Sequence, residues 1–271
     1  MIDSGLDTDA SGHTPKVTVV VPTFRRKDLL KETVDSILAQ TYRDFELIIV
    51  DNMSEDGTAE YVAGLNDPRV RYYRNPNGGI IAVNRNFGIR QARGEYIALC
   101  DDDDVWQPTK LEKQVTLLSN RPAVAMCYCN AAVFTTLSQR ATPWMMKRVH
   151  TDYYRNLLIG NFIPNSSVLL RRADWDALGG FREERELIAV EDYEMWLRLA
   201  REHEIAYIDE CLLLYRVHPS AASNSRVKMA RKHLNVLIRG LTLKTVSPRY
   251  LLAVVRSAVR VVYAGIVLKA I

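Results

Sequence analysis

Residues 94–104 read GEYIALCDDDD, an apolar run that ends in four consecutive aspartates. A short apolar run of this kind is typical of a buried parallel strand. The carboxylates of Asp101 to Asp104 would repel one another strongly unless a cation neutralised them. Because hard divalent ions such as Mg²⁺ and Mn²⁺ prefer carboxylate oxygen, the stretch favours a metal site at the end of a strand over a solvated acidic turn.

The residues before this stretch alternate between strand and helix patterns. Apolar runs occupy Val17–Pro22, Phe45–Asp51 and Val70–Asn75. Helical spacing of apolar residues covers Leu29–Gln40 and Thr58–Leu65, and another helix is expected after the turn Asn77-Gly78-Gly79. This alternation predicts a parallel, doubly wound sheet of the nucleotide-binding type. In such sheets the ligand lies at the carboxyl ends of the strands, so the loops that follow three of these strands should meet at one crevice.

Two familiar phosphate-binding motifs are missing from this pattern. The chain has no GxxxxGK[ST] loop, and no GxGxxG follows the first strand. ATPase and dinucleotide-dependent dehydrogenase activities therefore lack their usual phosphate cradles. The pair Gly78-Gly79 lies just before a predicted helix, where backbone N–H groups could approach a nucleotide. A plain turn explains the same pair equally well.

Two later segments contain candidate catalytic and metal-binding groups. A helix is predicted from about Asp192 to Glu202, and Glu191 and Asp192 lie at its start, where a carboxylate can act as a general base on an acceptor hydroxyl. Acidic residues are also common in a first helical turn for purely electrostatic reasons. Farther on, Arg216 and His218 follow an apolar strand. The guanidinium can bind phosphate through two hydrogen bonds, and the imidazole can complete a carboxylate metal site.

Seven blocks in a fixed order give the chain a clear family resemblance. They read VVVPTFRR, LIIVDNMSEDGT, NPNGGIIAVNRNFG, GEYIALCDDDDVWQP, GGF, EDYEMWLRL and YRVH. They span Lys16 to Ser225 and resemble the family 2 glycosyltransferases, which have the GT-A fold. The resemblance implies an α/β protein with a mostly parallel, Rossmann-like sheet flanked by helices. It also implies transfer of a sugar from a nucleotide diphosphate to an acceptor hydroxyl, with inversion at the anomeric carbon and with Mn²⁺ or Mg²⁺ as cofactor.

The same resemblance assigns roles to individual residues. The donor nucleotide would be bound by Pro22, Thr23, Phe24, Arg26, Asp51, Gly79, Arg85, Asp101 and Asp102. The metal would be held by Asp103 and His218, with Arg216 on the diphosphate. Asp192 matches the base that deprotonates the acceptor, and Glu191 is the alternative. The family's habit favours uracil as the nucleobase, so a UDP-sugar is the expected donor.

One block departs from the family's pattern. The family usually has Asp-Asp-Gly-Ser where this chain has Asp51-Asn52-Met53-Ser54. The missing carboxylate and glycine affect the expected base and ribose contacts, whereas the metal ligands and the catalytic base are unaffected.

The resemblance also divides the chain into parts. Residues 1–15 are expected to form a flexible tail, and residues 16–222 a GT-A catalytic domain. Within that domain, residues 16–110 would be the nucleotide-binding half and residues 111–222 the acceptor half. Residues 223–271 would be a basic helical extension.

Charge is distributed unevenly along the 271 residues. The chain has 36 basic and 32 acidic side chains, but from Cys211 onward there are 11 basic and no acidic ones. The last segment is therefore strongly cationic, and the rest carries a net negative charge. A cationic segment indicates an anionic partner, either nucleic acid or the anionic face of a membrane. Nucleic acid is disfavoured because a polyanion would meet Asp101 to Asp104.

Helical spacing continues through the basic segment. Two helices are predicted, one before and one after Ser247, and Arg249, Arg256 and Arg260 lie along one side of the second. A basic amphipathic helix is typical of a membrane interface, so residues 247–271 are expected to bind a membrane surface. Packing on the catalytic domain, or on a second subunit of a homo-oligomer, is the alternative.

The expected location follows from two missing patterns. No stretch reaches the ~20 uncharged apolar residues of a membrane span, and the first residues lack the pattern of a secretory signal. We therefore expect a cytoplasmic protein, peripheral on the cytoplasmic face of the membrane. Its acceptor would be a saccharide or a lipid-linked molecule in bacterial-type polysaccharide or glycolipid assembly.

Two other functions are compatible with parts of this pattern. A nucleotidyltransferase would share the sheet and the metal, but it calls for a glycine-rich loop with a lysine after the first strand, and VPTFRR is not such a loop. A catalytically silent GT-A scaffold could act through its basic C-terminal helices. The intact Asp103, Asp192 and His218 argue against the silent scaffold.

Overall fold

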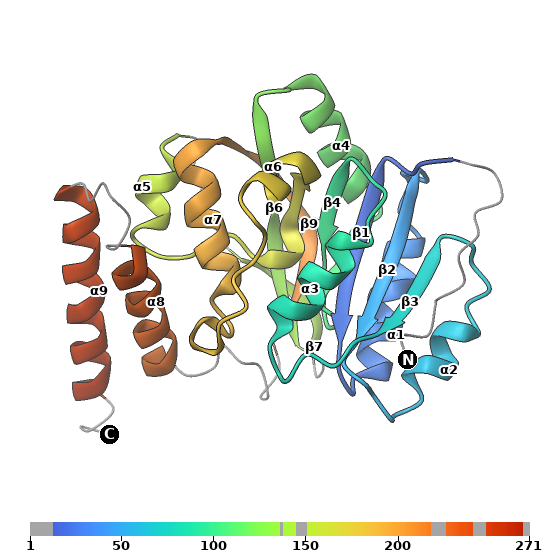
Figure 1. Cartoon of the computed structure of the whole chain (residues 1–271), viewed down its shortest axis with the longest axis horizontal. Coiled ribbons are helices and arrows are strands. Elements are labelled where there is room, and N and C mark those ends of the chain that lie inside the picture. The colour runs from blue at the N-terminus through green and yellow to red at the C-terminus, as the bar shows by residue number, and fades with distance from the viewer. Residues whose placement is uncertain (1–12, 136–137, 145–150, 218–225, 241–247, 268–271) are drawn as a thin grey trace.

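The computed structural model of the chain describes residues 13–135, 138–144, 151–217, 226–240 and 248–267. Within these residues one nine-stranded sheet runs through the molecule in the order β3-β2-β1-β4-β8-β6-β9-β5, and β7 pairs with β6. Helices lie on both faces of this sheet, and the two last helices stand at one end of the molecule (Figure 1).

The N-terminal half of the sheet is parallel, as expected. Its strands are β1 (Val17–Thr23), β2 (Phe45–Asp51), β3 (Val70–Arg74) and β4 (Tyr96–Leu99). Every residue of β1 and β2 is buried, which explains why both read as continuous apolar runs. The connecting helices are α1 (Lys27–Leu38), α2 (Thr58–Ala63) and α3 (Ile81–Arg90).

Helix α3 packs on the sheet through a glycine, Gly88, at the contact. A Cβ added to Gly88 would lie 2.6 Å from Cγ1 of Val20 and 3.1 Å from Cγ2 of Val50. Contacts below 3.0 Å are not tolerated without movement. Gly88 therefore lets α3 lie directly on β1 and β2, and α3 carries Arg85 toward the ends of these strands.

The other half of the sheet is mixed. It contains β5 (Val105–Trp106), β6 (Val124–Thr135), β7 (Ser138–Trp144), β8 (Val168–Arg171) and β9 (Glu204–Val217). β8 is antiparallel to both β4 and β6, whereas β9 is parallel to β6. Short helical segments connect them: α4 (Lys110–Asn120), α5 (Tyr153–Leu157), η1 (Asn165–Ser167), α6 (Arg172–Ala177), η2 (Arg185–Leu187) and α7 (Glu191–Glu202).

Two helices follow the sheet, as the sequence predicts. They are α8 (Arg226–Gly240) and α9 (Pro248–Val267). Helix α8 is attached to the body through the guanidinium of Arg239, which lies 3.5 Å from Glu184 and 3.3 Å from Glu186. Helix α9 packs on α8, where the Tyr250 hydroxyl donates to the carbonyl of Leu237 at 2.8 Å. No helix in the described part of the chain is long and apolar enough to cross a membrane.

Candidate active site

The carboxyl ends of β1, β2 and β4 lie at the same edge of the sheet. Thr23 and Asp51 are register partners at the ends of β1 and β2. β4 pairs with the other side of β1 and leads directly into Asp101. The loops that the sequence places at one crevice are therefore neighbours in the fold.

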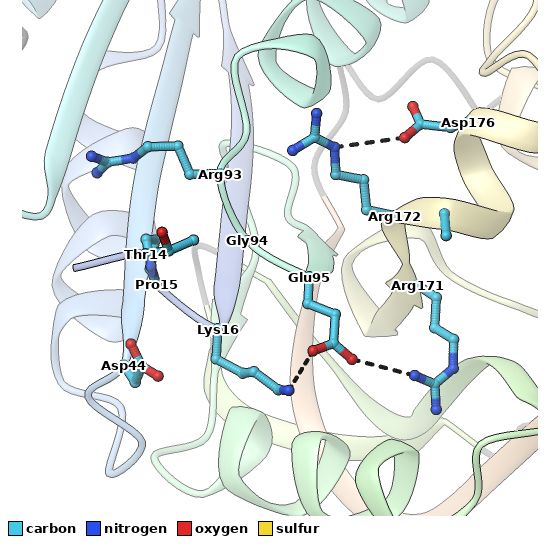
Figure 2. A pocket seen from close by; sticks show the side chains of 11 residues that line it. Thr14, Pro15, Lys16, Asp44, Arg93, Gly94, Glu95, Arg171, Arg172 and Asp176 are labelled. Atoms are coloured by element: carbon cyan, nitrogen blue, oxygen red, sulfur yellow. Dashed lines mark hydrogen bonds and ion pairs between the residues drawn. The ribbon is translucent and has the colours of Figure 1, made fainter. Parts of the chain in front are cut away.

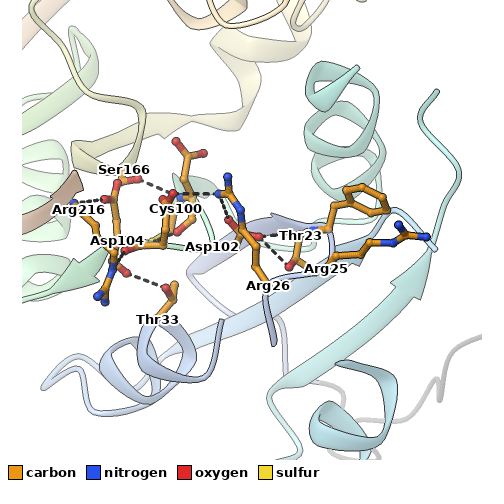
Figure 3. A network of polar contacts seen from close by, with 12 residues as sticks. Thr23, Arg25, Arg26, Thr33, Cys100, Asp102, Asp104, Ser166 and Arg216 are labelled. Atoms are coloured by element: carbon orange, nitrogen blue, oxygen red, sulfur yellow. Dashed lines mark hydrogen bonds and ion pairs between the residues drawn. The ribbon is translucent and has the colours of Figure 1, made fainter. Parts of the chain in front are cut away.

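Asp102 and Asp103 share one cation, the guanidinium of Arg26. Nη1 of Arg26 donates to Oδ1 of Asp102 at 3.0 Å and to Oδ2 of Asp103 at 2.9 Å. The Thr23 hydroxyl donates to Oδ2 of Asp102 at 2.8 Å. Burial raises the pKa of Asp102 to about 6, although Arg26 favours the ionised form. Figure 3 shows Thr23 and Arg26 both pointing at Asp102.

This arrangement fits a divalent ion in one respect: the space between two carboxylates already accommodates positive charge. Among the described residues, no three His, Cys, Asp or Glu side chains gather into a complete metal site. His218, an expected metal ligand, lies outside the described residues. Mg²⁺ is commonly held by one or two carboxylates together with substrate phosphates, so Asp102 and Asp103 suit a site that substrate oxygens complete.

Asp104 points to the opposite side of the loop (Figure 3). Its Oδ1 accepts the backbone N–H of Arg216 at 2.9 Å, and its carbonyl accepts the Thr33 hydroxyl at 2.8 Å. Nε of Arg216 donates to the carbonyl of Asp103 at 2.7 Å, and Nη2 donates to Glu32 at 2.6 Å. These bonds fix the aspartate loop to β9 and α1. Nε and Nη2 of Arg216 are thus bonded within the protein. The diphosphate contact expected of Arg216 stays a prediction.

Arg85 connects the aspartate loop to the start of α7. Its side chain is 4% exposed; Nη2 donates to Oδ1 of Asp101 at 2.6 Å, and Nη1 donates to Oε1 of Glu191. Nδ2 of Asn165 donates to the same oxygen of Asp101 at 3.0 Å. Burial disfavours the charge of Arg85, but Asp101 and Glu191 outweigh burial and raise its pKa. Arg85 is thus a buried bridge, and its contact with a nucleotide stays a prediction.

Asp192, the expected base, lies beside Glu191 in the first turn of α7. Its Oδ2 accepts Nδ2 of Asn161 at 3.1 Å, and its Oδ1 accepts the N–H of Tyr193 at 2.7 Å. Burial, followed by the charge of Glu191, raises the pKa of Asp192 to about 7, while Arg85 acts in the opposite direction. A carboxylate whose pKa lies near the working pH is well suited to general-base catalysis.

Asp51 and Asn52 organise the loops beside the aspartates. Oδ1 of Asp51 accepts the N–H of Ser54 at 3.0 Å and its hydroxyl at 2.5 Å, while Oδ2 accepts the Tyr72 hydroxyl at 2.5 Å. Oδ1 of Asn52 accepts the N–H of Asn77 at 2.9 Å. The residue that replaces the family's second carboxylate therefore holds the glycine turn. The base or ribose contact expected of Asp51 stays a prediction.

The remaining expected donor contacts lie on β1 and on neighbouring loops. Pro22 is buried within β1, and Phe24 follows this strand with 46% of its surface exposed. The guanidinium of Arg25 lies 5.0 Å from the centre of the Phe24 ring. Gly79 has a φ of +83°, and no atom lies within 4 Å of an added Cβ. Phe24 thus offers an open aromatic face, and Gly79 is exposed and donates its N–H to Oδ1 of Asn77 at 2.8 Å.

Asn161 and Asn165 are site residues that the sequence reasoning missed. They belong to the segment NFIPNSS, residues 161–167, which contains no carboxylate and no regular strand or helix pattern. Their contacts with Asp192 and Asp101 join parts of the chain that are 31 and 64 residues apart. The asparagines and serines between apolar segments indicate a polar loop, but the sequence does not show which residues they contact.

A separate open pocket of about 540 Å³ lies at the opposite end of the parallel strands. Two of its lining residues, Lys16 and Glu95, form an ion pair, and Arg171 lies 3.5 Å from Glu95 (Figure 2). Lys16 lies just before β1, and Glu95 lies just before β4. Ligands of parallel sheets bind at the carboxyl ends of the strands. We therefore assign the candidate active site to the aspartate edge and not to this pocket.

Proteins of similar sequence are glycosyltransferases by name. TuaG of Bacillus subtilis (strain 168), whose name assigns it to teichuronic acid biosynthesis, is 30% identical over 225 residues, which are 80% of this chain and 85% of TuaG. WcaA of Escherichia coli (strain K12), whose name assigns it to colanic acid biosynthesis, is 33% identical over 199 residues, which are 70% of this chain and 68% of WcaA.

Solved structures show the same fold at lower identity. Staphylococcus aureus TarS 1–349 in complex with UDP-GlcNAc has a TM-score of 0.70 at 18% identity, over 90% of this chain and 72% of TarS 1–349. The mannosyltransferase PcManGT of Pyrobaculum calidifontis, in complex with GDP-Man and Mn²⁺, has a TM-score of 0.64 at 18% identity, over 94% of this chain and 76% of PcManGT. The expected GT-A fold is confirmed.

The sequence itself matches a family model over most of the catalytic region. The model is that of glycosyl transferase family 2, and it matches residues 18–178, more than half of the chain. The match includes β1 from its second residue, the aspartate run and the Arg85 helix. The chain belongs to glycosyl transferase family 2.

Proposed function

We propose that this glycosyltransferase transfers a sugar from a UDP-sugar to an acceptor hydroxyl, with inversion, during assembly of a bacterial cell-surface polysaccharide or glycolipid. The observation that carries the proposal is the buried bridge from Asp101 through Arg85 to Glu191. This bridge joins the aspartate loop to the helix turn that carries Asp192, which supports a donor site and an acceptor site next to each other. The sugar donor and the acceptor hydroxyl would then bind within reach of each other.

The donor would bind at the aspartate edge. Asp103, with Asp102 and His218, would hold Mn²⁺ or Mg²⁺, which when bound neutralises charge on the leaving diphosphate. Arg26 would leave its present carboxylate partners and add a second positive charge near the diphosphate. The exposed ring of Phe24 would pack on the nucleoside.

The acceptor would bind on the α7 side of the candidate site. Asp192 would take the proton of the acceptor hydroxyl while that oxygen forms a bond to the anomeric carbon. The bond from this carbon to the diphosphate oxygen breaks on the opposite face, and the electron pair leaves with the diphosphate. A single displacement of this kind inverts the configuration. Asn161 would hold the Asp192 carboxylate in position.

Named relatives support the choice of substrates. TuaG and WcaA are named for teichuronic acid and colanic acid biosynthesis, both of which are polysaccharides. The TarS structure holds UDP-GlcNAc, and the PcManGT structure holds GDP-Man with Mn²⁺. A UDP-sugar and Mn²⁺ are therefore the first combination to test. We also infer that the enzyme acts on a saccharide or lipid-linked acceptor at the cytoplasmic face of a membrane.

Thermal stabilisation by nucleotides tests this function. UDP, GDP, dTDP and CDP are each added with and without Mn²⁺, because a ligand that binds only the folded state raises the melting temperature. We expect a shift with UDP that depends on Mn²⁺ and that Asp103→Asn abolishes. Asp35→Asn, which removes the same charge from an exposed position on α1, is the control. No shift with any of the four nucleotides would favour a silent scaffold.

A further inference from the structure

The outward face of α9 carries a row of exposed apolar side chains. Its members are Leu251, Leu252, Val255 and Val259, with exposed fractions of 52%, 48%, 59% and 62%. Their spacing places all four within about 100° of the helix circumference. Tyr250 and Ala253, on the opposite face, are buried. Figure 1 shows α9 as the outermost helix at its end of the molecule, so this row faces away from the body.

A row of arginines lies along one side of the apolar row. Helical spacing places Arg249, Arg256 and Arg260 next to one another around the circumference, directly beyond Leu252. All three are exposed in part, but Arg256 and Arg260 also line a small pocket against the body, and Arg260 donates to the carbonyl of Ile159. No carboxylate occurs in the sequence after Glu210, so neither α8 nor α9 contains an acidic side chain that could neutralise them. The outer surface of α9 is therefore both apolar and cationic.

We propose that this face of α9 lies in the surface of an anionic lipid bilayer. Apolar and basic rows side by side are the features of a helix that lies in a membrane interface, with the apolar side chains inserted and the arginines at the headgroups. The described helices do not span a membrane, which fits a helix lying on the surface. A second copy of this chain would bring the same arginines and no carboxylate to the contact, so charge complementarity favours anionic lipid.

The same helix is attached to the acceptor side of the candidate active site. Nη1 of Arg260 donates to the carbonyl of Ile159, and Ile159 is itself 40% exposed. Two residues farther on, Asn161 donates to Asp192 at 3.1 Å. His233 of α8 packs on the ring of Tyr193, with the ring centres 4.8 Å apart. Provided that the proposed function holds, a bilayer under α9 would present a lipid-linked acceptor on the side where Asp192 lies.

Vesicle co-sedimentation of the full chain tests the proposal. The probes are vesicles of phosphatidylcholine alone and vesicles that also contain phosphatidylglycerol. We expect binding only to the anionic vesicles. Leu251→Gln/Val255→Gln/Val259→Gln should reduce this binding about tenfold or more, because inserted methylene groups supply much of the affinity. Since these side chains are exposed, the variant should melt at the wild-type temperature.

Charge is tested separately. Arg249→Gln/Arg256→Gln should weaken binding to the anionic vesicles roughly 30-fold, as expected for two basic residues at such a surface. Lys31→Gln/Arg90→Gln removes the same charge from exposed positions on α1 and α3 and should bind like the wild type. The proposal would be overturned if the wild-type protein did not bind anionic vesicles, or if the triple glutamine variant of the apolar row bound them equally well. A dimer in light scattering that only the apolar variant loses would assign the face to a second copy.

Failure of this proposal can be told from failure of the proposed function. Each α9 variant is also melted with UDP and Mn²⁺. An unchanged nucleotide shift with lost vesicle binding supports both proposals. Vesicle binding without any nucleotide shift would support the membrane proposal and contradict the proposed transferase function.

Discussion

The residues from Asp101 to Asp104 are adjacent in the chain but differ in their partners. The first is bonded to Arg85, the second and third to Arg26, and the fourth to the backbone of Arg216. The first three carboxylates therefore each face a cation, whereas burial and the charges of Asp103 and Asp101 raise the pKa of Asp104 well above its ordinary value, which favours its neutral form. The side chains of Arg85 and Arg216 are 4% and 3% exposed, whereas that of Arg26 is 34% exposed. Arg26 is thus the partner that can move at the lowest cost.

Asp192→Asn should lower turnover by about 10²-fold or more, because an amide cannot accept the acceptor's proton. In the wild type, activity should fall as the pH drops below about 7, since the base must be ionised and burial raises the pKa of Asp192 to about 7. Turnover of wild type and variant across this range measures both effects. A variant that retains near wild-type turnover would exclude Asp192 as the base, and Glu191→Gln would then be tested.

The same substitution should stabilise the fold at alkaline pH. Folded Asp192 keeps its proton up to a pKa of about 7, whereas an unfolded aspartate loses it near pH 4. The folded state therefore binds more protons in this window, and wild-type stability falls as the pH rises through it. An asparagine has no such proton, so the stability of Asp192→Asn should not fall in this pH window for this reason. Its melting temperature should exceed the wild-type value near pH 8 and equal it near pH 4; equal values at both would contradict the raised pKa.

Arg26→Gln should bind Mn²⁺ more tightly than the wild type in the absence of nucleotide, by about tenfold. The reason is that the guanidinium competes with the ion for Asp102 and Asp103. Titration calorimetry measures the affinity without any turnover. Arg25→Gln is the matched control, because Arg25 faces Glu55 at 3.6 Å and not the aspartates. Weaker Mn²⁺ binding by Arg26→Gln would show that Arg26 supports the site and does not compete for it.

At the scale of elements, helix α3 depends on one close contact. Gly88→Ala improves helix propensity by about 1 kcal/mol, but overpacking against a core typically costs about 1–3 kcal/mol. Because the new Cβ would lie 2.6 Å from Val20, we expect a net loss of roughly 1 kcal/mol in the free energy of unfolding. Urea denaturation measures it. In a Val20→Ala background the same change should be neutral or stabilising, and an equal loss in both backgrounds would contradict this contact.

The strands β1 to β4 could be predicted because their signals are local. Each is a short apolar run, and the helices between them have regular spacing. β5 could not be predicted, because Val105 and Trp106 are too few for any period and pair with β9, more than 100 residues later. The antiparallel direction of β8 is likewise set by its neighbours β4 and β6 in the sheet.

Some residues of the candidate site could likewise be predicted from local sequence, and others could not. A run of aspartates after a strand and a Glu-Asp pair at a helix start are local signals, and both lie at the expected edge. The bond between Arg85 and Glu191 joins residues 106 positions apart, and only the fold reveals it. The amides of Asn161 and Asn165 were missed because an asparagine in a loop has many ordinary structural uses.

At the scale of the whole molecule, the uneven charge of the sequence has two roles. Part of the basic segment is used internally, because Arg239 faces Glu184 and Glu186 and the Lys232 amine donates to the carbonyl of Ile188. These contacts attach α8 to the body. Arg260 of α9 is also used internally, on the carbonyl of Ile159, whereas Arg249 and Arg256 stay exposed beside the apolar row.

Arg85 links the first half of the chain, through Asp101, to the second half, through Glu191, at the candidate active site. Arg85→Met leaves Asp101 and Glu191 without their shared cation in a buried position, and breaking such a pair typically costs about 3–5 kcal/mol. We expect a loss of this size in urea denaturation. Arg85→Lys keeps the charge but loses the forked geometry that reaches both carboxylates, so it should lose less. A loss below about 1 kcal/mol for Arg85→Met would show that the bridge does not hold the halves together.

The same pair of variants separates stability from chemistry. Arg85 lowers the pKa of Asp192, so its removal should raise that pKa and move the acid limb of the activity profile to higher pH. Arg85→Lys retains the charge and should leave the limb near its wild-type position. If both variants lose activity equally at every pH, the bridge acts on the position of α7 alone. If the limb moves only for Arg85→Met, the charge that joins the two halves of the molecule also adjusts the base.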